Sequence, residues 1–158
     1  DYTQKFIEQI LQQEKGLHGF IILDVDYFKS VNDNYGHIVG DKVLSMLGKF
    51  LQKQFRENDI LGRIGGDEFV ILMRNISQRE NVEQRINDLL KKIPEMKIAE
   101  MDNQSITISV GVALAPESGN TFIKLYRHAD QALYETKRAG RNGYSIYNPE
   151  QTDQSTTK

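Results

Sequence analysis

The sequence predicts an α+β fold with a ferredoxin-like βαββαβ core, in which a central, mostly antiparallel sheet is flanked by helices. Short apolar runs rich in β-forming residues alternate with longer segments whose apolar residues recur at helical spacing. Two of the strands are joined by Gly65-Gly66-Asp67, where paired glycines suit a tight hairpin turn with positive φ. The chain has 158 residues, of which 39% are hydrophobic, and this suits one domain around one core.

The first half of the chain is predicted to form a helix, a strand, a second helix and a hairpin. Apolar residues at helical spacing indicate a helix over about 2–15, and two glycines end it. The apolar run at 19–25 is typical of a buried central strand. A polar, turn-rich stretch around 32–36 precedes a strongly amphipathic helix over about 39–55. The glycine turn is then flanked by two strands, at 60–64 and 68–73.

The second half repeats the alternation of helix and strand. Spaced apolar residues predict a helix over about 78–93, which ends at a proline. The alternating segment 105–113 is typical of a strand, and a last helix is expected over about 121–139. A short strand at 144–147 completes the fold, and the polar segment 148–158 is expected to be disordered.

The overall charge and the absence of cysteine exclude several classes of function. Lys and Arg number 20 against 22 Asp and Glu, so there is no basic excess for wrapping nucleic acid or coating a membrane. Without cysteine there are no disulfides, zinc–thiolate sites or iron–sulfur clusters. The longest apolar run, Phe20–Leu23, is far too short to span a bilayer, so we expect a cytoplasmic domain. The chain begins at Asp1 without Met, which suggests a piece of a longer protein whose membrane anchoring stays open.

Acidic residues distant in the sequence are predicted to converge. Asp24 and Asp26 lie at the end of a buried strand, at i and i+2, and their side chains therefore face the same way. In a ferredoxin-like sheet the first strand lies antiparallel to the third, which brings Asp67 and Glu68 beside this strand end. Mg²⁺ and Mn²⁺ take oxygen ligands of this kind, usually together with substrate phosphates. The alternative, for Asp24 and Asp67 taken singly, is a solvated turn acid.

Other polar residues are candidates for binding phosphate or a base. Lys137 and Arg141 are four apart and would share a helix face if the last helix reaches both; Lys29 follows the first strand. The alternative for the first two is to complement a helix C-terminus. Asn32 and Asp41 could recognise a guanine edge, because a carboxylate accepts from its ring N–H and amine. Their alternatives are a turn residue and an acid in the first turn of a helix.

Four sequence blocks together resemble the GGDEF family of diguanylate cyclases. The signature stands intact as Gly65-Gly66-Asp67-Glu68-Phe69. The other blocks are Leu23–Lys29 with Val31–Asp33, Gly36-His37 and Gly40-Asp41; Thr107–Ala113; and Ala129–Tyr134 with Lys137 and Gly140–Asn142. The resemblance covers about 1–147, which is the expected domain. It implies a palm-like fold, as in nucleotidyl cyclases and polymerase palms.

The resemblance also implies an activity and a set of site residues. Two GTP would condense into cyclic di-GMP and two pyrophosphates, in a site formed between the halves of a two-fold homodimer. Each site would hold two Mg²⁺ or Mn²⁺ ions. Carried over by position, the metal ligands would be Asp24, Asp67 and the Val25 carbonyl, with Glu68 as supporting catalytic acid; Asn32 and Asp41 would hold guanine; Lys29, Lys137 and Arg141 would hold phosphates.

A second, inhibitory site is implied by Arg56-Glu-Asn-Asp59, which precedes the signature at the family's R-x-x-D spacing. We expect Arg56 at a helix end and Asp59 at the start of the next strand, on the surface away from the acidic cluster. An arginine can fork onto phosphate or the guanine N7/O6 edge, and a carboxylate can accept from N1/N2. Arg85 could add a contact to bound cyclic di-GMP. The alternative function is an inactive GGDEF domain that binds GTP or cyclic di-GMP without turnover.

Overall fold

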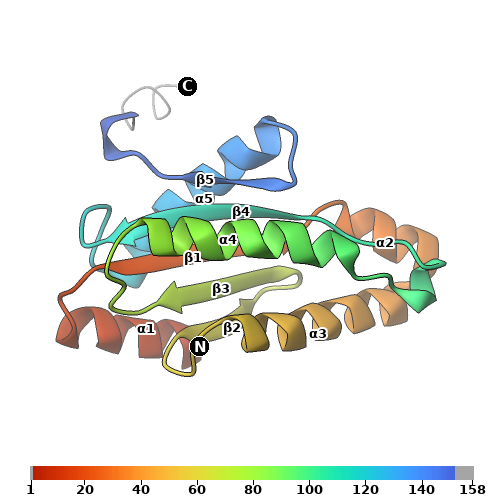
Figure 1. Cartoon of the computed structure of the whole chain (residues 1–158), viewed down its shortest axis with the longest axis horizontal. Helices are drawn as coiled ribbons and strands as arrows, with labels where there is room; N and C mark the ends of the chain where they lie inside the picture. Colours follow the sequence, from red (N-terminus) through yellow and green to blue (C-terminus); the bar gives the residue numbers. More distant parts are fainter. Residues whose placement is uncertain (1, 152–158) are drawn as a thin grey trace.

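The computed structural model describes residues 2–151, and these form a single layer of sheet with helices on both faces (Figure 1). The elements in chain order are α1 Tyr2–Gln13, β1 His18–Val25, α2 Phe28–Tyr35, α3 His37–Gln54, β2 Ile60–Ile64, β3 Glu68–Met73, α4 Glu80–Lys92, η1 Ile93–Glu95, η2 Ala99–Met101, β4 Ile108–Ala115, α5 Phe122–Arg138, β5 Gly143–Ile146 and η3 Pro149–Gln151. Of the tail 148–158 that was expected to be disordered, Pro149–Gln151 form η3 instead, and 152–158 lie outside the described residues.

The strands form one sheet in the order β2-β3-β1-β4-β5. Neighbours are antiparallel except for β4 and β5, which run parallel. The βαββαβ core and the mostly antiparallel sheet predicted from the sequence are therefore confirmed. Gly65 in the β2–β3 turn has φ 68, as the hairpin prediction requires. The turn places the start of β3 beside the end of β1, with Asp24 directly opposite Glu68.

Strand β1 is buried on both faces and separates two apolar layers. Ile21 and Leu23 pack into the layer beneath α2, α3 and α4, whereas Phe20 and Ile22 pack into the layer beneath α1 and α5. Such burial on both sides explains why β1 is a continuous apolar run rather than an alternating one. Figure 1 shows α4 in front of the sheet.

Helix α5 approaches β4 unusually closely at Gly111. A Cβ atom at this position would lie 2.1 Å from the Ala129 carbonyl oxygen and 2.5 Å from the Leu133 backbone nitrogen. Only glycine allows the backbone of α5 to rest on the strand in this way. The contact sets the height of α5 above the sheet, and α5 carries several of the polar residues described below.

One local prediction was wrong. Residues 28–35 form helix α2 instead of a turn-rich stretch, because Val31 is buried and Phe28 and Tyr35 pack against the same core. This helix places Asn32 in a regular element, and α3 begins at His37, so Asp41 lies beyond the first turn. Helix α5 ends at Arg138, close to the predicted end, so it does not reach Arg141 and the condition for a helix face shared with Lys137 is not met. Within the part of the chain described, no helix has the length and apolar character needed to cross a membrane.

Candidate active site

The end of β1 and the β2–β3 turn bring three carboxylates together. Asp24 pairs in register with Glu68, and Asp67 stands in the turn just before it. The charge of Asp67 contributes to raising the pKa of both other acids, after the larger effect of burial. The predicted convergence of these acids, more than 40 residues apart in the sequence, is therefore confirmed.

Asp24 combines a paired and an unpaired oxygen. Its Oδ2 accepts a hydrogen bond from the Lys137 ammonium at 2.7 Å. Its Oδ1 is buried and has no hydrogen-bond partner among the described residues. Burial raises the pKa of Asp24, and the Lys137 contact opposes that rise. An unpaired buried carboxylate oxygen is costly, so this atom fits a cation as its missing partner.

A metal ion held by Asp24 and Asp67 would need further ligands from the backbone, the substrate and water. Over residues 2–151 no group of three or more His, Asp or Glu is arranged to hold a metal ion. A hard cation such as Mg²⁺ is nevertheless commonly held by one or two carboxylates together with substrate phosphates and water. Asp24 and Asp67, with a backbone carbonyl, match that sparse pattern.

Glu68 is held by a residue that the sequence reasoning missed. The Tyr126 hydroxyl donates a hydrogen bond to the half-buried Glu68 carboxylate. Burial raises the pKa of Glu68, and the charges of Asp130, Asp24 and Asp67 raise it further. Burial and the bond to Glu68 likewise raise the pKa of Tyr126 above its usual value. Tyr126, Asp130 and Lys137 lie at i, i+4 and i+11 on α5, a helical spacing that could have identified this face.

Helices α2 and α3 bring the two candidate base-binding residues close to each other. The Asn32 side-chain oxygen is buried, has no hydrogen-bond partner within the described chain, and lies against Gly40. A Cβ at Gly40 would be only 1.9 Å from that oxygen. The next residue, Asp41, is exposed. The pair therefore offers an amide oxygen without a partner among residues 2–151 and an exposed carboxylate near the junction of α2 and α3.

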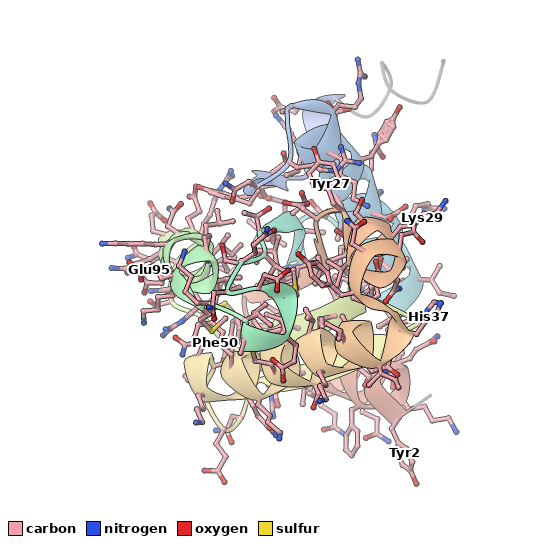
Figure 2. All side chains as sticks on the ribbon, turned by 90° about the vertical axis from the view of Figure 1, so that its right-hand side faces the viewer. Tyr2, Tyr27, Lys29, His37, Phe50 and Glu95 are labelled. Atoms are coloured by element: carbon pink, nitrogen blue, oxygen red, sulfur yellow. The ribbon has the colours of Figure 1, made fainter. Side chains whose placement is uncertain are left out.

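The three candidate phosphate-binding cations come from different elements. Lys29 is exposed on the first turn of α2, and Figure 2 looks onto this end of the molecule with Lys29 and Tyr27 labelled. Lys137 reaches Asp24 from α5. Arg141 stands in the loop after α5 with φ 65, and its guanidinium lies over the Tyr27 ring at 5.0 Å.

The R-x-x-D pair lies at the opposite end of the sheet from the acids. Arg56 follows α3 and Asp59 precedes β2, as predicted. The Asp59 side chain, however, is only 1% exposed, so the expectation of a surface carboxylate was wrong. Its oxygens accept from the Arg56 backbone N–H and guanidinium, each at 3.1 Å, and from the Arg74 N–H at 3.0 Å. Arg74 in turn bonds Glu14 at the end of α1. Because Arg74 lies 15 residues further along the chain, no local pattern predicts this burial.

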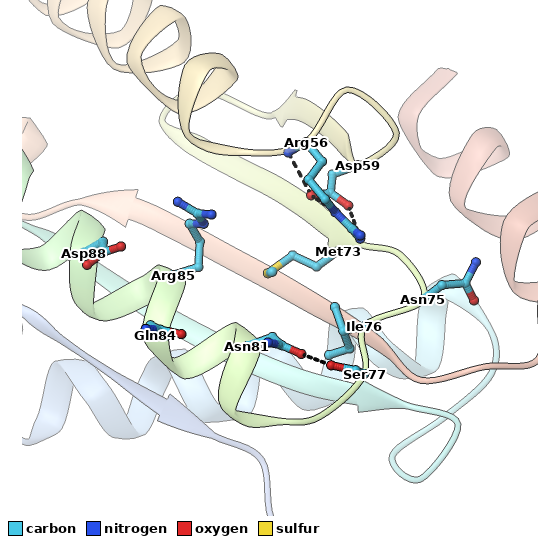
Figure 3. A pocket seen from close by; sticks show the side chains of 10 residues that line it. All are labelled: Arg56, Asp59, Met73, Asn75, Ile76, Ser77, Asn81, Gln84, Arg85 and Asp88. Atoms are coloured by element: carbon cyan, nitrogen blue, oxygen red, sulfur yellow. Dashed lines mark hydrogen bonds and ion pairs between the residues drawn. The ribbon is translucent and has the colours of Figure 1, made fainter.

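Arg56 and Asp59 line a cavity of about 550 Å³ beside α4. Its wall includes Met73 at the end of β3 and Arg85 on α4, and Figure 3 shows Arg85 across the cavity from Arg56. The Arg56 side chain is 55% exposed, so its guanidinium is accessible. Arg56 of the loop between α3 and β2 and Arg85 of α4 therefore line a cavity large enough for a small organic anion.

Comparison with known proteins assigns the family. The family model described as "Diguanylate cyclase, GGDEF domain" matches residues 1–143. The chain belongs to the GGDEF family. The GGDEF domain is similar to the Escherichia coli protein named "Probable diguanylate cyclase DgcT", with 36% identity over 140 residues, which are 85% of this chain and 30% of DgcT. It is also similar to the Escherichia coli "Cyclic di-GMP phosphodiesterase PdeR", with 37% identity over 134 residues, which are 84% of this chain and 20% of PdeR.

Solved structures agree with this assignment. The active GGEEF domain of a diguanylate cyclase from Vibrio cholerae superposes on this GGDEF domain with a TM-score of 0.81 and 31% identity, covering 93% of this chain and 92% of that one. The GGDEF domain thus has the fold of these cyclase domains. It spans less than a third of the length of DgcT and PdeR.

Proposed function

We propose that this GGDEF domain condenses two GTP into cyclic di-GMP with release of two pyrophosphates. The observation that supports it most is the intact signature turn, which presents Asp67 and Glu68 beside Asp24, whose Oδ1 has no partner among the described residues. Phosphoryl transfer needs charge neutralisation and alignment more than covalent help from the protein. A cluster of carboxylates and cations, without a nucleophile, suits that requirement.

Asp24, Asp67 and the Val25 carbonyl would hold divalent cations, Mg²⁺ or Mn²⁺, two per site. The unpaired Asp24 oxygen supports this assignment. When bound, such ions polarise the α-phosphate and favour deprotonation of the attacking 3′-hydroxyl. Glu68 is fixed by Tyr126 next to these ligands and adds negative charge to the site.

Lys29, Lys137 and Arg141 would bind the phosphates. Lys137 already balances Asp24, and its ammonium can donate to a phosphate oxygen as well, since it carries three donors. Charge accumulates on the pyrophosphate as it leaves, and fixed cations stabilise it. One domain would bind one GTP, so joining two requires a second copy. We infer a two-fold homodimer in which each half presents its GTP to the other.

The decisive experiment is to incubate the purified domain with GTP and Mg²⁺ and to identify the product by mass. We expect cyclic di-GMP, with a specific activity that rises with protein concentration because two copies must meet. The second candidate, a binding module without turnover, is kept because a similar domain occurs in PdeR. If calorimetry shows that GTP binds but no product forms with either Mg²⁺ or Mn²⁺, the binding module is favoured and the cyclase proposal is contradicted.

The site should select guanine over adenine. Guanine presents ring N–H and amine donors where adenine presents an acceptor, and Asn32 and Asp41 offer matching oxygens. A site built to pair such groups strongly rejects a base that leaves them unpaired. We expect ATP in tenfold excess to slow product formation less than about twofold and not to be cyclised. Mass spectra of GTP–ATP mixtures measure this, and abundant mixed cyclic GMP–AMP would contradict the assignment.

We also propose that cyclic di-GMP inhibits the domain by binding at Arg56 and Asp59, with Arg85 as a further contact. Support comes from the cavity that Arg56, Asp59 and Arg85 line. Because Asp59 is already bonded to Arg56 and the Arg74 backbone, the accessible Arg56 guanidinium would make the main contact with the ligand. If cyclic di-GMP bound here bridged two GGDEF domains, it would hold them in an arrangement in which their two GTP molecules cannot meet.

The Arg56→Ala variant tests this inhibitory site. Loss of a charge-assisted bond to phosphate should weaken cyclic di-GMP binding at least about tenfold, measured by calorimetry. Inhibition of turnover should weaken in parallel. Lys53→Ala is the matched control, since Lys53 is an exposed cation in the last turn of α3 and does not line this cavity. Equal affinity and equal inhibition in wild type and Arg56→Ala would refute the site.

A further inference from the structure

Two adjacent residues after β1 contact two adjacent residues after α5. The Asp26 carboxylate accepts a hydrogen bond from the Asn142 backbone N–H at 3.0 Å. The Tyr27 ring lies under the Arg141 guanidinium, 5.0 Å from ring centroid to Cζ. Residues 26 and 27 thereby hold the loop that carries a candidate phosphate-binding arginine.

The backbone at this corner is strained on both sides of the contact. Tyr27 and Arg141 have φ values of 56 and 65, in the left-handed region that L-residues rarely adopt, and Asn142 has φ 48 in the same region, which asparagine tolerates better. Such conformations cost free energy and persist only where the surroundings enforce them. Tyr27 is also 65% exposed, so burial of its ring does not explain an aromatic residue here.

Asp26 is engaged differently from its neighbour Asp24. Its Oδ1 accepts from the Ser109 hydroxyl at 2.5 Å, and its Oδ2 accepts from the Thr107 hydroxyl at 2.6 Å and from Asn142. Both oxygens are therefore committed, in a side chain that is itself buried. The two aspartates therefore differ in role. Asp24 has an oxygen left for a ligand, whereas Asp26 connects the end of β1 to β4 and to the loop after α5.

We propose that Asp26 and Tyr27 are positioning residues that hold Arg141 ready to bind a phosphate of GTP, an inference that rests on the proposed function. Asp26 fixes the backbone of the loop, and Tyr27 fixes the plane of the guanidinium. An arginine stacked on a ring leaves its N–H donors at the edges, where they can fork onto phosphate oxygens. Tyr27 therefore orients Arg141 without using up the donors that the phosphate needs.

The test is a double-mutant cycle with calorimetric binding of GTP and of guanosine, which has the same base and no phosphate. Tyr27→Leu removes the ring face and should weaken GTP binding about two- to fivefold, with guanosine binding unchanged. Tyr27→Phe keeps the ring face and should bind GTP like wild type. In an Arg141→Ala background, Tyr27→Leu should cause no further loss, because the ring then has no guanidinium to hold.

Asp26→Asn leaves one acceptor oxygen where the carboxylate had two and removes a charge, and it should weaken GTP binding more where Arg141 is present than in the Arg141→Ala background. The melting temperature of Asp26→Asn, compared with that of wild type, serves as the control for folding. If Tyr27→Leu lowers GTP affinity equally with and without Arg141, or lowers guanosine affinity in step, the positioning role is refuted. If Arg141→Ala leaves GTP affinity unchanged, the phosphate role and this inference both fail. The predicted pattern in a protein that makes no cyclic di-GMP would refute the cyclase proposal alone.

Discussion

The Asp67→Asn variant is expected to make cyclic di-GMP at least about 100-fold more slowly than wild type while folding normally. Asparagine keeps the shape of the side chain but removes the negative charge that a divalent cation requires. Asp67 stands in a turn beside Asp24 and Glu68, so the substitution changes the charge of the site without leaving a cavity in the core. The effect should therefore fall on turnover and not on stability.

The measurement is the rate of product formation at saturating GTP and Mg²⁺, with thermal unfolding followed by circular dichroism. Asp102→Asn is the matched control. Asp102 is exposed and has φ 54, a conformation that asparagine tolerates well, so the same change of charge should leave both turnover and stability near wild type. Near-normal turnover of Asp67→Asn would rule out the metal-binding role of this carboxylate.

The largest loss of stability is expected from Gly111→Ala. The added Cβ would meet backbone atoms of α5 at 2.1 and 2.5 Å, and neither the strand nor the helix can yield as a flexible side chain would. The free energy of unfolding should fall by at least about 2 kcal/mol. Because α5 carries Lys137 and Tyr126, a displaced helix should also lower turnover in whatever protein remains folded.

Urea unfolding measures this loss, and Gly48→Ala is the matched control. Gly48 lies inside α3, and the nearest atom to an added Cβ is a Phe69 ring carbon at 3.4 Å, an ordinary contact. Alanine there should leave stability unchanged or raise it by up to about 1 kcal/mol, since glycine is a poor helix former. A Gly111→Ala protein as stable as wild type would show that α5 can shift freely on the sheet.

The sheet and the acidic cluster could be predicted because they depend on local patterns. The apolar run of β1 and the glycine turn fix which strands pair, and pairing places Asp24 opposite Glu68. Helix α2 was missed because Asn32, Asp33 and Asn34 favour turns. The helical spacing of Phe28, Val31 and Tyr35 was therefore given too little weight. Here packing on the core overrides propensity.

The contacts that complete the site could not be predicted from local patterns. Lys137 bonds Asp24 across 113 residues, and Asn142 bonds Asp26 across 116. Each depends on where α5 ends relative to β1, and that position depends on the close approach at Gly111. The burial of Asp59 depends in the same way on a backbone N–H of a later segment.

Arg74 joins two parts of the chain that the sheet alone would leave independent. Its backbone N–H holds Asp59, and its guanidinium holds Glu14 and the Asn58 carbonyl. The next residue, Asn75, bonds Glu14 and His18. The end of α1 and the loop between α3 and β2 are therefore both tied to the segment that follows β3, so local opening of that segment would release both. The amide groups at the end of α1 should therefore exchange their hydrogens more slowly than those of a helix end without such bonds.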